Sequence, residues 1–404
     1  MQIVVQKFGG TSVASPELIR NVARRVVSAK EQGKQVVVAV SAMGHTTDHL
    51  IDLARAVGDC CPEREMDMLL ATGEQVTIAL LAMALQNLGH RAISMTGAQA
   101  GILTDEAHTK ARILKIDPVR IQKELEKGNI VVVAGFQGMN VDHETTTLGR
   151  GGSDTTAVAL AAALKAEVCE IYTDVDGVYT ADPRLIPDAR KLDLISYDEM
   201  LELASLGALV LQARSVEVAK QYGVTINVRS SFNDNPGTLV KESSDMEECR
   251  LLSGVAHDIN VAKIGLFDVP DRPGIATHLF KALADEKINV DMIIQSWMRS
   301  GRNDIVFTVT RDDLSKTIPI VERVMKEIGA LGMEYNDHVA KISIVGAGMV
   351  TNPGVAANMF EALAKENINI NMISTSEIKI SCVIEEDQAV RAVEAIHAKM
   401  IGKL

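Results

Sequence analysis

The chain of 404 residues is too long for one ordinary hydrophobic core, so two or three domains are expected. Its net charge of −12 and its aromatic content of 3% argue against a nucleic acid partner, which needs clustered cations and aromatic stacking platforms. No continuous apolar run approaches the roughly 18 residues of a membrane-spanning helix, and the N-terminal residues lack the pattern of a cleavable signal. We therefore expect a cytoplasmic protein without a membrane partner.

The cysteines and histidines give no sign of a disulfide framework or a zinc site. The number of cysteines is odd, and none of them shows C-x-x-C spacing. The histidines are scattered and form no H-E-x-x-H pair. We expect reduced thiols in a reducing compartment and no metal ion held by the protein. The cysteines are Cys60, Cys61, Cys169, Cys249 and Cys382.

The first predicted element is a buried strand, residues 3–5, that runs into Lys7-Phe8-Gly9-Gly10. Glycine has no Cβ to hold a phosphate group away, and the lysine adds positive charge beside exposed N–H groups. The segment matches neither the P-loop nor the dinucleotide-binding pattern. A tight turn is the alternative interpretation, and ATP is the first hypothesis for a ligand.

Three further β-branched runs also end in glycine, hydroxyl or charged residues. Continuous apolar runs are typical of a parallel sheet that is covered on both faces. Because ligands bind beyond the carboxyl ends of such strands, the loops together predict one shared site. The runs cover residues 36–40, 130–133 and 168–172, and the residues that follow them include Ser41, Gly135, Thr173 and Asp174.

Helical patterns lie between these strands. Ser15-Pro16-Glu17 predicts a helix start, because it offers a capping hydroxyl, a proline in the first turn and an early acid. Residues 74–88 and 156–165 predict two more helices. The alternation of strands and helices indicates an α/β sandwich with a mostly parallel sheet.

A polar cluster at residues 148–156 precedes the last of these helices. Its glycines and hydroxyls predict a phosphate cradle formed by the N–H groups of a helix N-terminus. The alternative is that Ser153 or Asp154 only caps the helix. Arg150 favours a ligand site, because a cap does not require an arginine.

These motifs resemble those of the aspartokinases, amino-acid kinases that phosphorylate a carboxylate. The resemblance runs in order to about residue 240, and it implies an amino-acid-kinase-type α/β/α sandwich over residues 1–245. The segments that carry it are KFGGTSV from Lys7, SAMGHTTD from Ser41, TGE from Thr72, GFQG from Gly135, LGRGGSDTT from Leu148 and YTDVDGVYTADPR from Tyr172.

The resemblance also implies a role for each site residue. The implied catalytic residues are Lys7 and Asp154. The implied ATP contacts are Lys7, Phe8, Gly9, Gly10, Ser41, Thr173, Asp174, Tyr179, Asp182 and Arg184. The implied aspartate contacts are Thr47, Glu74, Arg150, Gly151, Gly152 and Ser153, with Glu74 facing the ammonium group and Arg150 one carboxylate.

The residue types suit that chemistry. A carboxylate is already nucleophilic at neutral pH, so the reaction needs positioning and charge rather than a strong base. Lys7, helix N–H groups and a Mg²⁺ ion that bridges the phosphates would supply positive charge to the transferred phosphoryl group. One departure from the family is Leu209, which stands where a lysine near the phosphates is often found, so more would depend on Lys7 and Arg184.

Beyond a polar linker near residues 233–248, the chain contains an internal repeat. Residues 273–296 align with residues 353–376, and each copy shows a proline-glycine turn, a helix and a strand. The turn resembles the amino-acid-sensing turn of ACT domains, which occur in pairs in regulated aspartokinases. We therefore expect two α+β ACT domains, at residues 246–335 and 336–404.

The same resemblance implies regulation by lysine, threonine or both. Such modules usually pair their sheets across subunits, so a homo-oligomer is expected, or an assembly with a separately translated regulatory subunit that starts at Met246. The implied effector contacts are Asp271, Gly274, Ile275, Ala276, Asn289, Asp291 and Gln295 in the first copy, and Asn369, Ser374, Thr375, Ser376 and Glu377 in the second.

The leading interpretation is ATP-dependent phosphorylation of the side chain of L-aspartate to 4-phospho-L-aspartate, the first step towards lysine, threonine and methionine. One alternative is another amino-acid kinase of the same fold, acting on glutamate, acetylglutamate or a nucleotide. The other is a non-catalytic amino-acid sensor that keeps the kinase fold, for which Leu209 is slight support.

Overall fold

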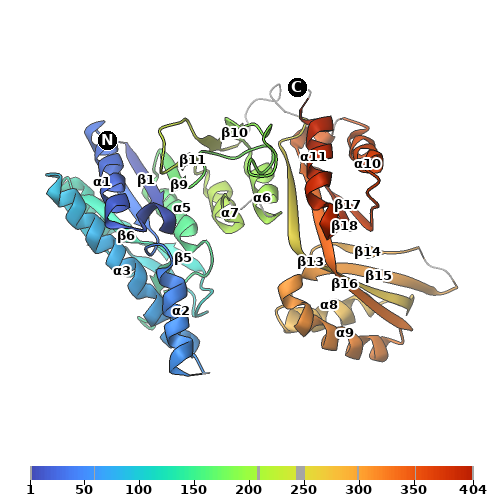
Figure 1. The fold of residues 1–404 in the computed structure, drawn as a ribbon. Helices are drawn as coiled ribbons and strands as arrows, with labels where there is room; N and C mark the ends of the chain where they lie inside the picture. The colour runs from blue at the N-terminus through green and yellow to red at the C-terminus, as the bar shows by residue number, and fades with distance from the viewer. Residues whose placement is uncertain are drawn as a thin grey trace. The chain divides into compact units, whose positions relative to one another are not determined.

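The computed structural model describes residues 2–58, 60–206, 210–242, 251–297, 300–350 and 352–402. They form two compact units, and each is described by itself (Figure 1). The first unit comprises residues 1–178, 191–205 and 209–246. The second comprises residues 179–190, 206–208 and 247–404.

The first unit is built on an eight-stranded sheet with the order β10-β12-β11-β9-β1-β2-β6-β3. Its central strands are parallel, as predicted, so their carboxyl ends lie along one edge. Residues 3–5 were predicted as the first strand, which continues to Phe8. The strands are β1 (Ile3–Phe8), β2 (Gln35–Val40), β3 (Ala92–Met95), β6 (Ile130–Ala134), β9 (Val168–Thr173), β10 (Leu194–Ile195), β11 (Ile226–Ser230) and β12 (Thr238–Val240).

Helices cover both faces of this sheet, which confirms the predicted sandwich (Figure 1). The helix α1 (Pro16–Glu31) and the helix α3 (Glu63–Asn87) pack on the face that carries Val4 and Phe8. On the other face, Lys7 of β1 contacts the helix α5 (Gly152–Leu164). The predicted cap is present, since Ser15 Oγ accepts the N–H of Leu18 at 3.3 Å.

α3 is a core helix of the first unit. Its 25 residues are long and apolar enough for a membrane-spanning segment, although no unbroken apolar run had suggested one, and half of its most apolar window is buried within the protein. The buried residues include two carboxylates, Asp67 and Glu74. A helix in a protein core can bury such acids only where other protein groups hydrogen-bond to them, as they do here.

The first unit also contains a smaller four-stranded sheet with the order β5-β4-β7-β8. Its strands β7 and β8 connect β6 to α5, so the end of β8 sets where the glycine-rich loop at residues 148–152 begins. Its strands are β4 (Ile102–Thr104), β5 (Ile113–Ile116), β7 (Gln137–Met139) and β8 (Thr145–Thr147). The other helices of this unit are the 3₁₀ turn η1 (Gly10–Val13), α2 (Thr46–Val57), α4 (Val119–Glu126), α6 (Tyr197–Ser205) and α7 (Ala213–Tyr222).

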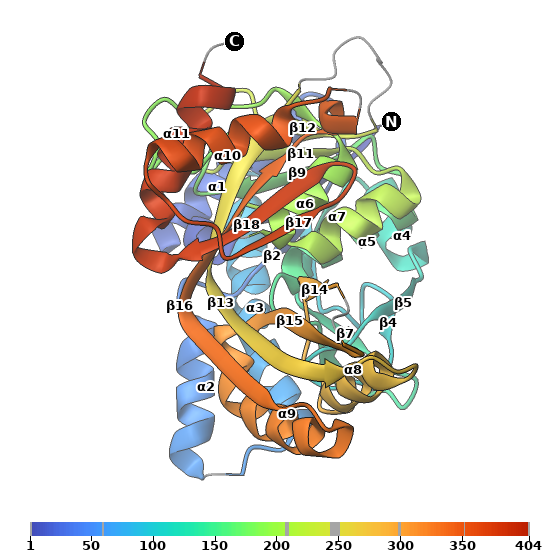
Figure 2. The same cartoon turned by 90° about the vertical axis from the view of Figure 1, so that its right-hand side faces the viewer.

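The second unit is a six-stranded antiparallel sheet with helices, which confirms the predicted α+β modules (Figure 2). Its sheet order is β14-β15-β13-β16-β18-β17. The strands are β13 (Gly254–Pro270), β14 (Ile293–Gln295), β15 (Arg302–Thr310), β16 (Gly332–Val345), β17 (Met372–Thr375) and β18 (Lys379–Glu385). The helices are α8 (Ile275–Asp285), α9 (Leu314–Ile328), α10 (Val355–Lys365) and α11 (Ala389–Met400), with 3₁₀ turns η2 (Arg311–Asp313), η3 (Ala347–Val350) and η4 (Glu386–Gln388).

The two modules are interleaved along the chain. The first half of β13, residues 254–258, pairs with residues 341–345 of β16, and Val255 lies in the core around α10 and α11. The second half of β13 pairs with β15 and packs on α8 and α9. The expected division into residues 246–335 and 336–404 therefore assigns one strand of the second core to the first module. The repeat alignment could not show this, because β13 lies outside it.

A segment from the middle of the chain also belongs to the second unit. Ala181 and Ile186 lie in the core that contains Met359, and Thr180 Oγ1 is 2.9 Å from His397 Nε2. Residues 179–190 are therefore grouped with the second unit, whereas the sequence placed them in a catalytic domain that ends at residue 245.

Candidate functional site

The two predicted catalytic residues are in contact. Lys7, next to last in β1, places its Nζ 2.6 Å from Asp154 Oδ1 in the first turn of α5. Their side chains are only 11% and 10% exposed, so the charges interact with little screening by water. A Cβ on Gly9 would lie 3.4 Å from Lys7 Nζ, so the glycine leaves room beside the ammonium group.

Ser41 and Ser153 join two of the predicted motifs. Ser41 Oγ donates to Ser153 Oγ at 3.0 Å, and the N–H of Ser41 donates to the Phe8 carbonyl at 3.1 Å. Gly135 allows this approach, because a Cβ there would lie only 2.9 Å from Ser153 Oγ and from the Val40 carbonyl oxygen. The ends of β1, β2 and β6 thus meet the N-terminus of α5, as predicted.

The glycine-rich loop before α5 has a left-handed backbone. Gly149 and Gly151 have φ angles of +75° and +70°, and a Cβ on Gly151 would overlap the side chain of Gln212 at 1.9 Å. Between them, Arg150 is exposed and has no ion-pair partner among the described residues. Its guanidinium group is therefore available to an anionic ligand.

The predicted phosphate cradle has fewer free donors than expected. The N–H group of Gly152 donates to Gly149 O at 3.0 Å, and those of Asp154 and Thr155 donate to Gly151 O at 3.1 and 3.2 Å. Carbonyl groups of the loop itself therefore accept the N–H groups that were predicted to bind phosphate. Positive charge at the site depends on the side chains of Lys7 and Arg150 and on the helix dipole.

Glu74 is a buried carboxylate with one oxygen to spare. Its side chain is 2% exposed, and Oε1 accepts the N–H of Ala42 at 3.0 Å. Oε2 is buried without a hydrogen-bond partner among the described residues. Burial raises the pKa of Glu74 to about 7, against the opposing effect of hydrogen bonds from the backbone. Such a group suits an ammonium ligand, which would supply both charge and donors. Thr47, in the first turn of α2, is half-buried.

The raised pKa gives a pH-dependent stability. A glutamate in the unfolded chain titrates near pH 4.3, so between that pH and about 7 the folded protein holds a proton that the unfolded chain has lost. Stability therefore falls as the pH rises through this interval. Without ligands, Glu74→Gln should melt at a higher temperature than the wild type at pH 8, and at nearly the same temperature at pH 5.

Differential scanning calorimetry at the two pH values measures this effect. Glu63→Gln, at an exposed acid in the first turn of the same helix, is the matched control. An equal change in melting temperature at both pH values for Glu74→Gln would contradict the argument.

Asp67 is a site residue that the sequence did not predict. It is fully buried on α3 and accepts hydrogen bonds from Thr147 Oγ1 at 2.5 Å and from the N–H of Thr109 at 3.1 Å. His108 Nδ1 lies 2.7 Å from the same carboxylate. These contacts fix the end of β8, immediately before the loop that carries Arg150. No distinguishing signal marks Asp67 in the sequence, because it is one of four acids in α3.

A second unpredicted anchor, Arg214, holds the same loop from α7. Its guanidinium group donates to the carbonyls of Leu148 at 3.0 Å and Ala111 at 2.7 Å. Burial lowers its pKa. The glycine-rich loop is thus fixed by charged groups from two helices, α3 and α7.

The predicted nucleotide contacts are only partly brought together in the first unit. The N–H of Gly9 donates to Tyr172 O at 3.4 Å, which places the first glycine loop beside the end of β9. Thr173 Oγ1 donates to Asp174 Oδ1 at 3.0 Å. The Phe8 ring is buried in the core and stacks on Tyr172 at 4.7 Å, so only its backbone can reach a ligand.

The remaining nucleotide residues lie outside the first unit. Tyr179, Asp182 and Arg184 belong to the second unit. Arg184 forms an ion pair with Asp182 at 2.7 Å, and its hydrogen bonds lower the pKa of that carboxyl. Leu209 lies outside the described residues.

The predicted effector residues are distributed over both modules. Gly274, with φ of +96°, precedes α8, and Asp271 accepts a hydrogen bond from Asn303 Nδ2 at 3.2 Å. Asp291 forms an ion pair with the buried Lys341 of β16. The other residues lie in the first turn of α8 (Ile275, Ala276), before or in β14 (Asn289, Gln295), before or in β17 (Asn369, Ser374, Thr375) and after β17 (Ser376, Glu377).

The residues described above form one polar site. A buried lysine, two adjoining hydroxyls, an exposed arginine and a buried glutamate converge on the ends of parallel strands. That set can hold two anions and one ammonium group, which is the requirement for transfer of a phosphoryl group to an amino acid. Within the described residues, no three His, Cys, Asp or Glu side chains gather in a way that could hold a metal ion.

Comparison with known proteins shows the family to which the chain belongs. The profile of the amino acid kinase family matches residues 2–230, and that of the ACT domain matches residues 268–324 and 342–400. An aspartokinase of Bacillus sp. (strain MGA3) is 55% identical over 98% of this chain and 97% of its own length. Aspartokinase 2 of Bacillus subtilis is 53% identical over the same shares. The structure of E. coli aspartokinase III with aspartate and ADP is 25% identical, with a TM-score of 0.85 over 99% of this chain and all of that one.

Proposed function

The chain belongs to the amino acid kinase family and, within it, to the aspartokinases, and from that membership we propose how its residues perform the reaction. The reaction transfers the γ-phosphoryl group of ATP to the side-chain carboxylate of L-aspartate and gives 4-phospho-L-aspartate. The observation that carries the assignment of residues is the buried contact between Lys7 and Asp154 at the edge where the parallel strands end.

In this proposal, Lys7 acts on the transferred phosphoryl group. Its Nζ is held by Asp154 and stands beside a glycine that leaves space for phosphate oxygens. A positive charge that is already in place stabilises the charge that develops in the transition state without reorganisation. Asp154 orients Lys7, and Ser41 and Ser153 offer hydroxyls next to the phosphates.

Aspartate binds between two anchored groups. Its ammonium group takes the free oxygen of Glu74, and one carboxylate takes the guanidinium group of Arg150. The other carboxylate is then left to attack phosphorus. ATP and aspartate are both anions and repel each other. Holding them at reacting distance lowers the barrier, because the cost of bringing them together is met on binding.

Mg²⁺ is the proposed cofactor. The absence of a three-residue ligand cluster among the described residues fits an ion held mainly by ATP phosphates and water, as Mg²⁺ usually is. An ion bound there would neutralise negative charge on the phosphates.

A hydroxamate trap for acyl phosphate, run with aspartate and glutamate in parallel, tests the reaction. We expect product with aspartate only. Product with glutamate would point to another amino-acid kinase, and no product with either would point to a non-catalytic sensor.

Arg150→Lys keeps the positive charge but loses the paired N–H donors of the guanidinium group, so it should raise the KM for aspartate while the KM for ATP is unchanged.

We also propose that the ACT modules bind lysine, threonine or both, and that they assemble with a second copy or with a separately translated regulatory subunit. The support is the matched pair of ACT segments and the placement of the predicted effector residues beside them. Initial rates with each amino acid, alone and together, test the first part. If neither amino acid changes the rate or the melting temperature, the proposed regulation is wrong.

We place the enzyme in the cytoplasm, because the described cysteines are all unpaired.

A further inference from the structure

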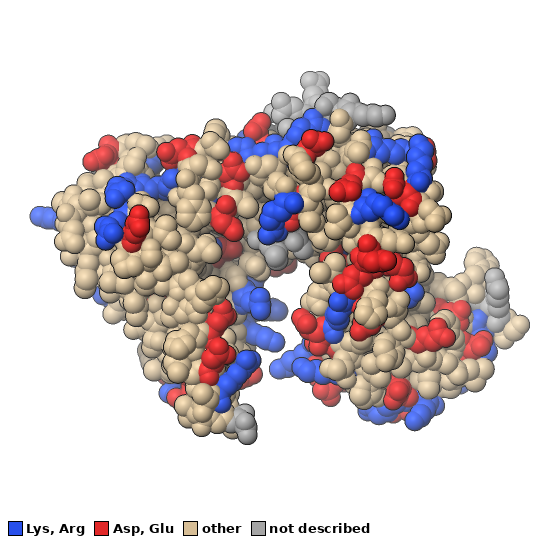
Figure 3. Space-filling view, in the orientation of Figure 1, with Lys and Arg blue, Asp and Glu red and all other residues tan. Residues whose placement is uncertain are grey.

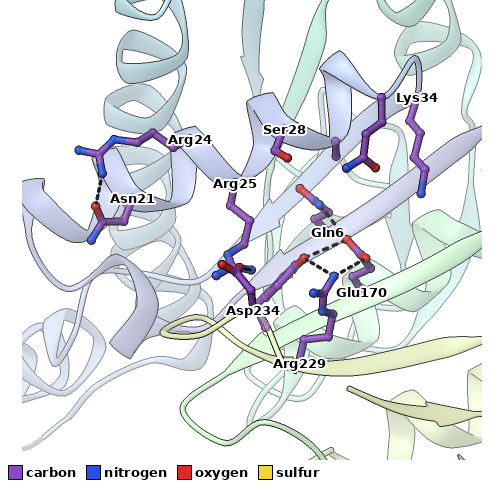
Figure 4. Close-up of a pocket in the computed structure, with 12 residues that line it drawn as sticks. Gln6, Asn21, Arg24, Arg25, Ser28, Lys34, Glu170, Arg229 and Asp234 are labelled. Atoms are coloured by element: carbon purple, nitrogen blue, oxygen red, sulfur yellow. Dashed lines mark hydrogen bonds and ion pairs between the residues drawn. The ribbon is translucent and has the colours of Figure 1, made fainter. Parts of the chain in front are cut away.

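A polar pocket of about 470 Å³ lies on the α1 face of the large sheet, away from the Lys7 face (Figure 4). Its floor is formed by residues of three adjacent strands, β1, β9 and β11, and its wall by the second half of α1. On this face, β1 carries Gln6 beside Glu170 of β9, and β11 carries Arg229 beside Tyr172 of β9. The volume falls in the range of pockets that bind small molecules, roughly 300–1,000 Å³.

The charges around this pocket are not balanced. Arg25 pairs with Asp234 at 3.0 Å, and Arg229 pairs with Glu170 at 3.3 Å. The other two cations that line the pocket, Arg24 and Lys34, have no acidic partner among the described residues. An excess of positive charge gathers here in a chain whose net charge is −12. Figure 3 shows that Lys and Arg side chains and Asp and Glu side chains both occur over the face that it draws.

The pocket also contains polar atoms whose hydrogen bonds are not satisfied. Gln6 is 1% exposed, and its Nε2 donates to Glu170 Oε2 at 2.8 Å while its Oε1 has no partner among the described residues. Nε of Arg229 is likewise buried without an acceptor. Buried polar groups without partners are rare in proteins, and they often indicate an absent ligand or water.

The cations on the floor are held in place before any ligand arrives. The guanidinium groups of Arg25 and Arg229 lie over the Tyr172 ring at 5.1 and 5.6 Å from its centroid. Tyr172 is itself stacked on Phe8. Guanidinium groups held on an aromatic ring keep N–H donors for a second partner, so little entropy is lost when an anion binds.

We propose that this pocket binds a small multivalent oxyanion of the phosphate class, at a site separate from the catalytic one. Its unpaired charges call for an anion, and donors from α1, from Lys34 before β2 and from Arg229 of β11 favour a ligand with several oxygens. The carboxylates of Glu170 and Asp234 are already paired, so they do not call for a cation.

The pocket is connected to the catalytic edge through the strands. Gln6 and Lys7 are neighbours in β1, with side chains on opposite faces, and Tyr172 directly precedes Thr173 in β9. An anion bound in this pocket would therefore contact β1 and β9, the strands that end at the nucleotide site. Its binding can nevertheless be measured without catalysis.

The experiment is isothermal titration with pyrophosphate of the full chain saturated with a non-hydrolysable ATP analogue and aspartate, without Mg²⁺. The analogue occupies the catalytic phosphate site, including the γ position beside Lys7, so the remaining binding reports the pocket. The test variant Arg24→Gln/Lys34→Gln removes the two unpaired charges and leaves both ion pairs intact. The control variant Arg20→Gln/Lys30→Gln removes two charges from α1 outside the pocket.

We expect one pyrophosphate per chain in the wild type and at least tenfold weaker binding in the test variant. The control variant should weaken binding less than twofold. If the wild type saturated with the ATP analogue does not bind pyrophosphate, or if both variants weaken binding equally, the proposal is wrong. Because the readout is binding, its failure would leave the assigned kinase reaction unaffected.

Discussion

Lys7→Ala should lower the turnover number by about 10² to 10³, the usual effect of removing one fixed group that stabilises transition-state charge. The KM for aspartate should change much less, because its proposed partners Glu74 and Arg150 remain. The coupled measurement of ADP release at saturating ATP and aspartate gives both constants.

The loss must be separated from a loss of folding. Lys7→Ala leaves the Asp154 carboxylate buried without its counter-ion, which can cost several kcal/mol for a buried pair. The double variant Lys7→Ala/Asp154→Asn removes that unpaired charge, so its melting temperature should rise above that of the single variant. Its activity should stay low. If the double variant recovers wild-type turnover, Lys7 only neutralises Asp154, and the catalytic assignment is wrong.

Asp67→Asn should raise the KM for aspartate about tenfold or more while the KM for ATP changes less than twofold. Asp67 accepts a hydrogen bond from Thr147 at the end of β8, immediately before the Arg150 loop, and it also contacts Thr109 N–H and His108 Nδ1. In Asp67→Asn, an NH₂ group replaces one carboxylate oxygen, so a donor would face the groups that donate to Asp67 in the wild type. A hydrogen bond to a buried charge is worth about 1.5–3 kcal/mol, which corresponds to this loss of affinity. Initial rates with each substrate varied in turn measure the two constants.

The matched control is Asp105→Asn. That carboxylate accepts the N–H groups of Arg112 at 2.9 Å and Ala107 at 3.3 Å in the loop that also carries Thr109, but it does not contact α3. It should leave the KM for aspartate near the wild-type value. Equal rises in the KM for ATP and for aspartate in Asp67→Asn would show that the residue supports the fold in general rather than the substrate loop.

The sequence predicted the edge of the sheet where the site lies, because β-branched runs and glycines are local signals. Each of the four predicted strands is present, and the contact of Lys7 with Asp154 follows from the parallel order of the strands. Family resemblance supplied the roles of individual residues, which neither spacing nor composition could give.

What the sequence missed depends on contacts between distant segments. Asp67 and Arg214 act on the carbonyls and hydroxyls of a loop far along the chain, and no local pattern reports such a partner. Phe8 looked like part of a ligand loop, but an alternating strand sends its side chain into the core. The number of free N–H donors in the predicted phosphate cradle was overestimated, because carbonyl groups of the loop accept several of them.

The division of β13 between two cores limits how this chain can be cut. A fragment that begins at residue 336 would lack the strand at residues 254–258, and β16 would expose an unpaired edge along residues 341–345. Such a fragment should aggregate. A polypeptide that starts at Met246 would keep all six strands, yet it would lack Ala181 and Ile186. It would therefore present an apolar surface, so a free regulatory fragment should be less stable than the same residues in the whole chain.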